Sequence, residues 1–217
     1  MTTASERVRA LKAKGALAQD DAAKLLDAIT PARSDAGSGW ARLADPFAKL
    51  GTAPGLALGA LFVAASFALG VALRVRFDGF LDLHLVTRDV TWRDAARDQV
   101  AAIAPFVVLW GAAMLGARGL RAVDFLAAVL LSRLAPAVMA APLALVMPRS
   151  VGAIPAPSIG LAIGVVIALV GVVFQITWLW RGFRTASGLG GARGMRVFIA
   201  ALVVAEIISK AWLHVSR

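Results

Sequence analysis

Long runs of apolar residues, with few polar interruptions, form the main pattern along this chain. A helix needs about 20 mostly apolar residues to cross a hydrocarbon core about 30 Å thick, because it rises about 1.5 Å per residue. Runs of this kind predict membrane helices near 52–73, 99–115, 122–147, 158–180 and 197–213. The expected fold is therefore all-α: a polytopic transmembrane helical bundle of about five spans.

Three of these runs carry interruptions. The second run is short and contains Pro105, and the third contains Pro136 and Pro142. A proline inside a helix leaves a backbone carbonyl without its donor and usually bends the helix, so we expect the third span to be bent or packed inside the bundle. The fifth run is the weakest, because Glu206 and Lys210 interrupt it.

The first 50 residues have the only soluble composition, and they predict a separate unit at 1–38 before a membrane domain at 39–217. Apolar positions at helical spacing between Ser5 and Leu17, a break at Gly15 and a second helix ended by Pro31 predict a short amphipathic hairpin. Residues 32–39 indicate a flexible linker, and 40–50 a short interfacial helix. No apolar run here suits a signal peptide, so we expect the segment to be retained.

Composition agrees with a membrane protein and excludes some chemistry. Of the 217 residues, 59% are apolar and 17% are charged, whereas soluble domains have about 45–50% and about 25%. The chain has no cysteine, which excludes disulfides, thiolate metal sites and cysteine nucleophiles. The net charge of +10 does not indicate nucleic-acid binding, because no basic cluster is interleaved with aromatic residues.

The distribution of Lys and Arg predicts the orientation. With five spans, fourteen of these residues lie on the side of the N-terminus and seven on the opposite side. Basic residues are enriched on the cytoplasmic side of membrane proteins. We therefore expect a bacterial inner-membrane protein whose N-terminus is cytoplasmic and whose C-terminus is external.

Small residues in two spans predict close helix contacts. The first span has a GxxxG pair at Gly55 and Gly59, and the fourth has one at Gly160 and Gly164. This spacing lets another helix approach closely. Frequent small residues in an alanine-rich helix are an equally good explanation of the pattern.

Ionisable side chains inside the predicted spans need partners, because a charge at a helix centre costs roughly 2.5–3.5 kcal/mol. Arg133 lies about ten residues into the third span, and Glu206, Asp124 or a lipid phosphate could pair with it. Glu206 and Lys210 have the i,i+4 spacing of an attractive pair. These residues predict either ion pairs that fix helix packing or a polar path for ions; the intramembrane polar set is Asp124, Arg133, Gln175, Glu206 and Lys210.

The connection after the first span holds a second polar group. Asp82 and His84 alternate with apolar residues and would face the same way in an extended segment, and Asp78 could join them through a bend at Gly79. Such ligands could hold zinc or manganese, or act as an acid and base. A structural role, with the carboxylates binding nearby arginines and amides, is the stronger expectation. We therefore expect no metal, cofactor or catalytic site.

A basic loop before the last span predicts contact with lipid headgroups. Residues 181–196 contain four arginines and no acidic residue, which could bind anionic headgroups or simply mark the cytoplasmic side. These arginines are Arg181, Arg184, Arg193 and Arg196.

Three stretches resemble the Yip domain family of five-helix membrane proteins, in its bacterial form. They are residues 76–84 after the first span, 121–133 at the start of the third, and 175–189 before the last. The resemblance covers residues 47–213, and it implies five spans and a cytoplasmic N-terminus. It implies no activity, and no matching Rab-recognition motif is visible.

These observations predict a non-enzymatic membrane protein that acts as a scaffold or accessory subunit. The lipid bilayer is one expected partner, and the others are a protein bound through residues 1–38 or a second copy of the chain. One alternative is a transporter or channel component that uses Arg133, Glu206 and Lys210. Another is a metal-dependent membrane enzyme built on Asp78, Asp82 and His84.

Overall fold

A computed structural model of the chain describes residues 4–18, 20–22, 50–77, 79–82, 84–86, 88–117, 119–146 and 159–216. Contacts within the chain divide it into two units, residues 1–44 and 45–217. The predicted linker at 32–39, the interfacial helix up to residue 49, and the second tail helix beyond residue 22 lie outside the described residues.

The first unit contains helix α1, Ala4–Ala13, which ends before Gly15, where the sequence predicts a break. Gly15 ends it with φ 68°, while the Gly15 amide bonds the carbonyl of Lys12 and the Ala16 amide that of Leu11. This pattern is a Schellman turn, in which a glycine adopts the left-handed conformation after a helix.

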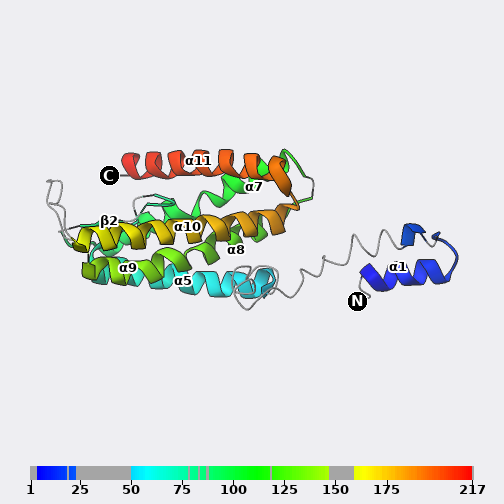
Figure 1. Cartoon of the computed structure of the whole chain (residues 1–217), viewed down its shortest axis with the longest axis horizontal. Helices are drawn as coiled ribbons and strands as arrows, with labels where there is room; N and C mark the ends of the chain where they lie inside the picture. Colours follow the sequence, from blue (N-terminus) through cyan, green and yellow to red (C-terminus); the bar gives the residue numbers. More distant parts are fainter. Residues whose placement is uncertain are drawn as a thin grey trace. The chain divides into compact units, whose positions relative to one another are not determined.

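The second unit is a helical bundle in which the chain runs back and forth along one axis (Figure 1). One element, α5, makes the first pass, and pairs of shorter helices make the second and third. The helices are α5 (Thr52–Leu73), α6 (Trp92–Ile103), α7 (Phe106–Met114), α8 (Ala122–Ser132), α9 (Leu134–Val146), α10 (Ile159–Ser187) and α11 (Gly191–Val215).

Four helices in the described part of the chain are long and apolar enough to cross a membrane: Thr52–Leu73, Ala122–Val146, Ile159–Ser187 and Gly191–Val215. They confirm the helices predicted for the first, third, fourth and fifth spans, the first with the predicted bounds. The third bends at Arg133, between α8 and α9, where Pro136 cannot donate to the Ser132 carbonyl. These helices point to a multi-pass membrane protein.

The second predicted span, 99–115, is wrong as a single helix. The pass begins earlier, at Trp92, and breaks between α6 and α7 at Pro105. Proline has no amide hydrogen, so Pro105 cannot bond the carbonyl of Ala101 four residues before it. The hydroxyl of Ser209 on α11 donates to that carbonyl over 2.9 Å, and this bond ties α11 to the break.

The predicted basic loop at 181–196 is also wrong, because helices occupy most of it. α10 continues to Ser187 and α11 begins at Gly191, which leaves only 188–190 between them. Gly188 adopts φ 68°, and the Ser187 hydroxyl donates to the Phe183 carbonyl and accepts from the Leu189 amide. Arginine favours helices, so the basic residues extend both of them.

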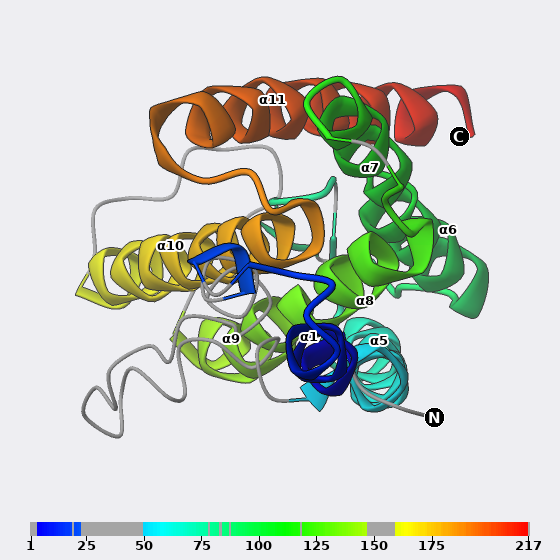
Figure 2. The ribbon, with the colours of Figure 1, turned by 90° about the vertical axis from the view of Figure 1, so that its right-hand side faces the viewer.

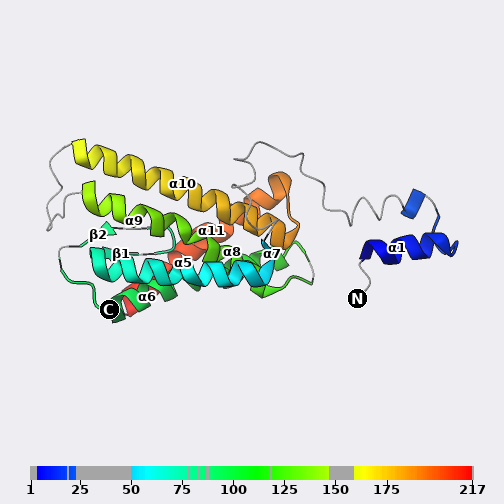
Figure 3. The same ribbon diagram turned by 90° about the horizontal axis from the view of Figure 1, so that it is seen from below.

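The connection between α5 and α6 folds into the bundle. It contains two short antiparallel strands, β1 (Val75–Arg76) and β2 (His84–Leu85), in which Arg76 pairs with His84. Seen along the helices, the strands lie inside the ring that the helices form (Figure 2), and Figure 3 places them near the end of the bundle where α5 ends. Phe77 and Phe80 are completely buried there.

Small residues on α5 allow α8 to approach closely. A Cβ at Gly59 would lie 2.5 Å from Leu130 Cβ, and one at Gly55 would lie 3.4 Å from the Leu131 side chain. On α10, Gly164 is buried and Gly160 half-buried. Another glycine of α10, Gly171, allows a close approach of α9, because a Cβ there would lie 2.8 Å from Met139.

Candidate functional site

The connection between α5 and α6, called the inserted connection below, is held by side chains from two distant helices, α10 and α11. The Glu206 carboxylate on α11 accepts from the backbone amides of Phe80, over 3.0 Å, and Leu81, over 3.1 Å. Gln175 on α10 donates to the Phe80 carbonyl over 3.0 Å. A segment without regular structure is stable inside a helical bundle only where other groups bond its amides and carbonyls, so these two side chains let the connection enter the bundle.

Gly79 makes this anchoring possible. It adopts φ 152°, and a Cβ there would lie 2.7 Å from Glu206 Oε1. A larger residue would therefore be strained and would push the carboxylate away. Glu206 lies nine residues before Val215, so the contact is about 14 Å from that end of α11.

Glu206 also belongs to a group of charges on the side of the bundle. Lys210 Nζ lies 3.6 Å from Glu206 Oε1, which is the predicted i,i+4 contact, and 2.8 Å from Asp82 Oδ2. The side chains of Lys210 and Asp82 are nearly half exposed, whereas that of Glu206 is 24% exposed. Lys210 therefore links the inserted connection to α11 through a second contact.

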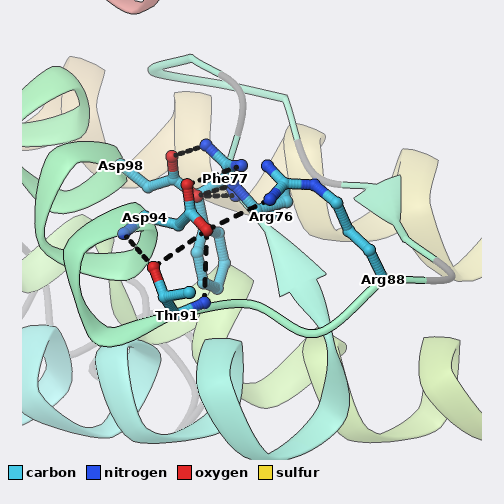
Figure 4. A network of polar contacts seen from close by, with 6 residues as sticks. All are labelled: Arg76, Phe77, Arg88, Thr91, Asp94 and Asp98. Atoms are coloured by element: carbon cyan, nitrogen blue, oxygen red, sulfur yellow. Dashed lines mark hydrogen bonds and ion pairs between the residues drawn. The ribbon is translucent and has the colours of Figure 1, made fainter. Parts of the chain in front are cut away.

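A more deeply buried network joins the connection to α6 (Figure 4). The Arg76 guanidinium donates to both oxygens of Asp98, each over 2.7 Å, and the Phe77 amide also donates to Asp98 over 3.1 Å. Asp98 is fully buried, and the side chain of Arg76 is 10% exposed. A bidentate pair of this kind is geometrically specific, so it fixes where β1 meets α6.

Asp94 extends the network toward the surface. It forms a capping box with Thr91 at the start of α6 and lies 3.4 Å from both Arg76 and Arg88. Burial alone would raise the pKa of Asp94, but hydrogen bonds from the Thr91 amide and hydroxyl and the charges of the two arginines lower it overall. Asp94 is therefore held in its charged form.

Arg133 lies at the inner end of the same group of charges. It is 1% exposed, and its guanidinium carbon lies 5.0 Å from the ring centroid of Phe77. Asp98 attracts it electrostatically. Its Nε and Nη2 atoms are buried and have no hydrogen-bond partner in the described part of the structure.

Five charged side chains form a series that leads from the surface into the bundle: Arg88, Asp94, Arg76, Asp98 and Arg133. Their signs alternate, and side-chain exposure falls from 63% at Arg88 to 14% at Asp94 and 10% at Arg76. Asp98 and Arg133 are buried. The series therefore ends on a cation in the interior.

The partners predicted for Arg133 were wrong. Glu206 binds the connection and Lys210, while Asp124 accepts a hydrogen bond from the Thr52 hydroxyl over 2.5 Å. Reaching a lipid phosphate is also excluded, because the side chain is buried within the bundle. The sequence does not indicate Asp98 as a partner, because residues 74–98 lie between the first two predicted spans and have the composition of a polar connection.

The structure describes only part of the predicted group of Asp78, Asp82 and His84. Asp78 and the side chain of His84 lie outside the described residues, and Asp82 forms the ion pair with Lys210. Among the side chains that are described, no three His, Asp or Glu residues lie close enough to hold a metal ion.

The predicted headgroup-binding arginines lie at the opposite end of the bundle from the inserted connection. Arg181 and Arg184 lie in the last turns of α10, and Arg193 and Arg196 in the first turns of α11. All except the half-buried Arg181 are exposed. Beside the end of α10 is a cavity of about 240 Å³ lined by Thr52, Asp124, Ala127, Thr185 and nearby glycine and alanine.

Another cavity, of about 90 Å³, lies between the connection, α9 and α10. Asp82 and Gln175 provide its polar lining, and Pro136, Met139 and Leu143 are among its apolar residues. Arg133 lines neither of the two cavities.

The sequence prediction missed Asp98, the most buried polar residue of α6. Two signals in the sequence indicate where this helix begins and which of its faces is buried. Thr91 and Asp94 have the T-x-x-D spacing of a helix N-terminus. Ala95, Asp98 and Ala102 recur at helical spacing, which places Asp98 on an apolar face. Gln99, Ser66 and Ser209, which are also buried, had no comparable signal.

Comparison of the chain with protein-family models, curated proteins and solved structures gives no match. The resemblance to the Yip domain family therefore stays a prediction from the three stretches of sequence.

Proposed function

We propose that this chain is a non-enzymatic integral membrane protein of the Yip type that serves as a scaffold or accessory subunit of a membrane complex. The observation that carries the proposal is the use of the buried polar groups. Asp98, Glu206, Gln175 and Ser209 each bind a backbone group or ion partner within the chain. Groups used in this way stabilise an assembly and are not presented to a substrate.

Two further features support a role in binding partners. The outer faces of α10 and α11 expose large apolar residues along their length, among them Val166, Val173, Ile199 and Ile207. In a bilayer such faces contact lipid or another membrane helix. The tail forms its own unit, in which Leu11 on α1 is 43% exposed.

We place the protein in the bacterial inner membrane with the N-terminus in the cytoplasm and the C-terminus outside. The support is the excess of basic residues at the end of the bundle that holds the start of α5, where Arg184, Arg193 and Arg196 are exposed. In this orientation these arginines face anionic lipid headgroups, each contributing about 1 kcal/mol of attraction.

The test is crosslinking in native membranes followed by purification of the tagged chain. The full-length chain should recover a specific protein, and tagging that protein should recover the chain in return. Deleting residues 1–38 should abolish both. Leu11→Gln should weaken recovery, whereas the matched change Lys12→Gln on the same exposed helix should not. Recovery of the chain alone would contradict the proposal.

A transporter or channel component is the second candidate, because Arg133 is an ionisable group inside the bundle, and two of its donors have no hydrogen-bond partner among the described residues. This function predicts that Glu206→Gln changes an ion or proton flux in proteoliposomes without unfolding the protein. No measurable flux in either the wild type or this variant would dispose of it.

A further inference from the structure

The larger of the two cavities opens at the end of the bundle where α5 starts. Polar side chains from three helices line it: Thr52 at the start of α5, Asp124 in the first turn of α8 and Thr185 near the end of α10. Thr185 is exposed, Thr52 and Asp124 are half-buried, and the lining residue Gly182 is buried. The cavity therefore runs inward from the surface, and a ligand from outside can reach its polar groups.

The cavity lies at the ends of three helices that are long and apolar enough to cross a membrane. Thr52, Asp124 and Thr185 are each within three residues of an end of their helix. Lipid headgroups lie on either side of the hydrocarbon core that such helices cross. In the proposed membrane placement the cavity is therefore at the level of the headgroups, which makes a headgroup its expected ligand.

The polar groups of the cavity are suited to a cationic donor. The Thr52 hydroxyl donates its only hydrogen to Asp124 over 2.5 Å. Its lone pairs, the carboxylate oxygens of Asp124 and the Thr185 hydroxyl oxygen can then accept hydrogen bonds from a ligand. A primary ammonium has several N–H donors, and a hydrogen bond that involves charged groups is roughly twice as strong as one between neutral groups. An ammonium would therefore bind both the carboxylate and the hydroxyls.

Two arginines of α10 supply the opposite charge next to these acceptors. Arg184 directly precedes Thr185 and is exposed, and Arg181 lies four residues before Thr185, which places it on the same side of the helix. A guanidinium binds phosphate through paired N–H donors. A ligand that carries an ammonium and a phosphate a few bonds apart would therefore meet groups of opposite charge at both ends.

We propose that this cavity binds the headgroup of a zwitterionic phospholipid with a primary ammonium, of the phosphatidylethanolamine type. The ammonium donates to Asp124, Thr52 and Thr185, and the phosphate binds Arg184 and Arg181. The volume of about 240 Å³ is sufficient, since a cavity of about 150 Å³ holds benzene, which is larger than an ethanolamine group. A choline headgroup lacks the N–H donors and a glycerol headgroup lacks the positive charge, so neither should replace it.

The test measures the apparent melting temperature of the full-length protein in nanodiscs whose phosphatidylcholine is replaced stepwise by lipids with identical acyl chains. Phosphatidylethanolamine should stabilise the wild type in a saturable way, and its N,N-dimethyl derivative should do so less, because methylation removes N–H donors. Any stabilisation by phosphatidylglycerol should be independent of Asp124, because that headgroup carries no cation.

Two variants in the cavity have matched controls outside it. Asp124→Asn should abolish the response to phosphatidylethanolamine, whereas Asp89→Asn, which removes an exposed carboxylate outside the cavity, should keep it. Thr185→Val should weaken the apparent affinity about fivefold, because it removes one hydrogen bond, whereas Thr177→Val on the same helix should not. If Asp124→Asn does not fold, the two threonine variants decide the question.

Soluble phosphoethanolamine, added to phosphatidylcholine nanodiscs, separates the lipid from a free ligand with the same groups. Stabilisation by the soluble compound without stabilisation by the lipid, or an equal response to phosphatidylethanolamine in the wild type and all variants, would overturn the proposal. The lipid site rests on the proposed membrane placement, but each can fail separately. A chain that does not enter nanodiscs would contradict the placement, whereas a chain that enters them and does not respond to phosphatidylethanolamine would contradict only the lipid site.

Discussion

The Ser209 hydroxyl donates a hydrogen bond to the Ala101 carbonyl, the same carbonyl that Pro105 leaves without its helical donor. The break in the second pass is therefore repaired from α11, a helix more than a hundred residues away in the chain. An unbonded carbonyl in an apolar interior is costly, so this single hydroxyl allows a proline within a membrane-length pass.

Removing the Ser209 hydroxyl should destabilise the protein only while Pro105 is present. Ser209→Ala should lower the free energy of unfolding by about 1 kcal/mol, since it leaves the Ala101 carbonyl without a partner. In a Pro105→Ala background residue 105 gains an amide that can bond this carbonyl, so the loss should shrink. A double-mutant cycle of reversible unfolding measures the coupling, and equal losses in both backgrounds would refute the repair.

Neutralising Asp98 should be strongly destabilising. Asp98→Asn removes the buried charge that binds Arg76 in two places, which should lower the free energy of unfolding by about 3–5 kcal/mol. The control is Asp89→Asn, because Asp89 pairs with Arg74 at the surface, with 83% of its side chain exposed. That change should cost less than about 1 kcal/mol. Similar losses in the two variants would show that the buried pair of Asp98 and Arg76 stabilises the protein no more than the surface pair of Asp89 and Arg74 does.

Acid should weaken the fold through Asp94. Its pKa is lower in the folded state than the usual value of 3.8, so its charged form contributes stability above that value. The contribution is lost as pH falls below about 4 and toward the folded pKa. Unfolding measured between pH 7 and pH 3 should show a steeper decline for the wild type than for Asp94→Asn. Parallel declines would mean that Asp94 does not contribute.

Adding a methyl group at Gly59 should disturb the contact between α5 and α8. Gly59→Ala would place a Cβ 2.5 Å from Leu130 Cβ, and overpacking of this kind costs about 1–3 kcal/mol. Gly111→Ala on α7 is the control, because nothing lies within 4 Å of a Cβ there. It should be neutral or slightly stabilising. Equal melting temperatures for the two variants would contradict the close packing.

The sequence predicted the long apolar helices well but not the path of the chain between them. The first span has the predicted bounds because its 22 residues contain no charge and start after a glycine. The second pass begins among charged residues, where an apolar window does not detect it. Hydropathy detects segments that are apolar along their whole length, whereas α6 carries charges up to Asp98 and is apolar only after Gln99.

The site could be predicted only in part, for a similar reason. Arg133 and Glu206 are conspicuous as charges within apolar runs, and the contact between Glu206 and Lys210 follows from helical spacing alone. The Phe80 amide, however, lies 126 residues from Glu206 and belongs to backbone that any sequence would supply. Contacts of this kind depend on how the connection folds, and no local pattern encodes them.

The number of membrane crossings is the central claim of this account, and the absence of cysteine makes it directly measurable. Four continuous helices alone would leave both ends of the chain on the same side, whereas a crossing by α6 and α7 places them on opposite sides. A cysteine at Lys12, exposed on α1, and one added after Arg217 can each be labelled with an impermeant maleimide in intact cells and in inverted vesicles. We predict that the added C-terminal cysteine is labelled in intact cells and Lys12→Cys only in inverted vesicles; labelling of both from the same side would contradict the five-pass bundle.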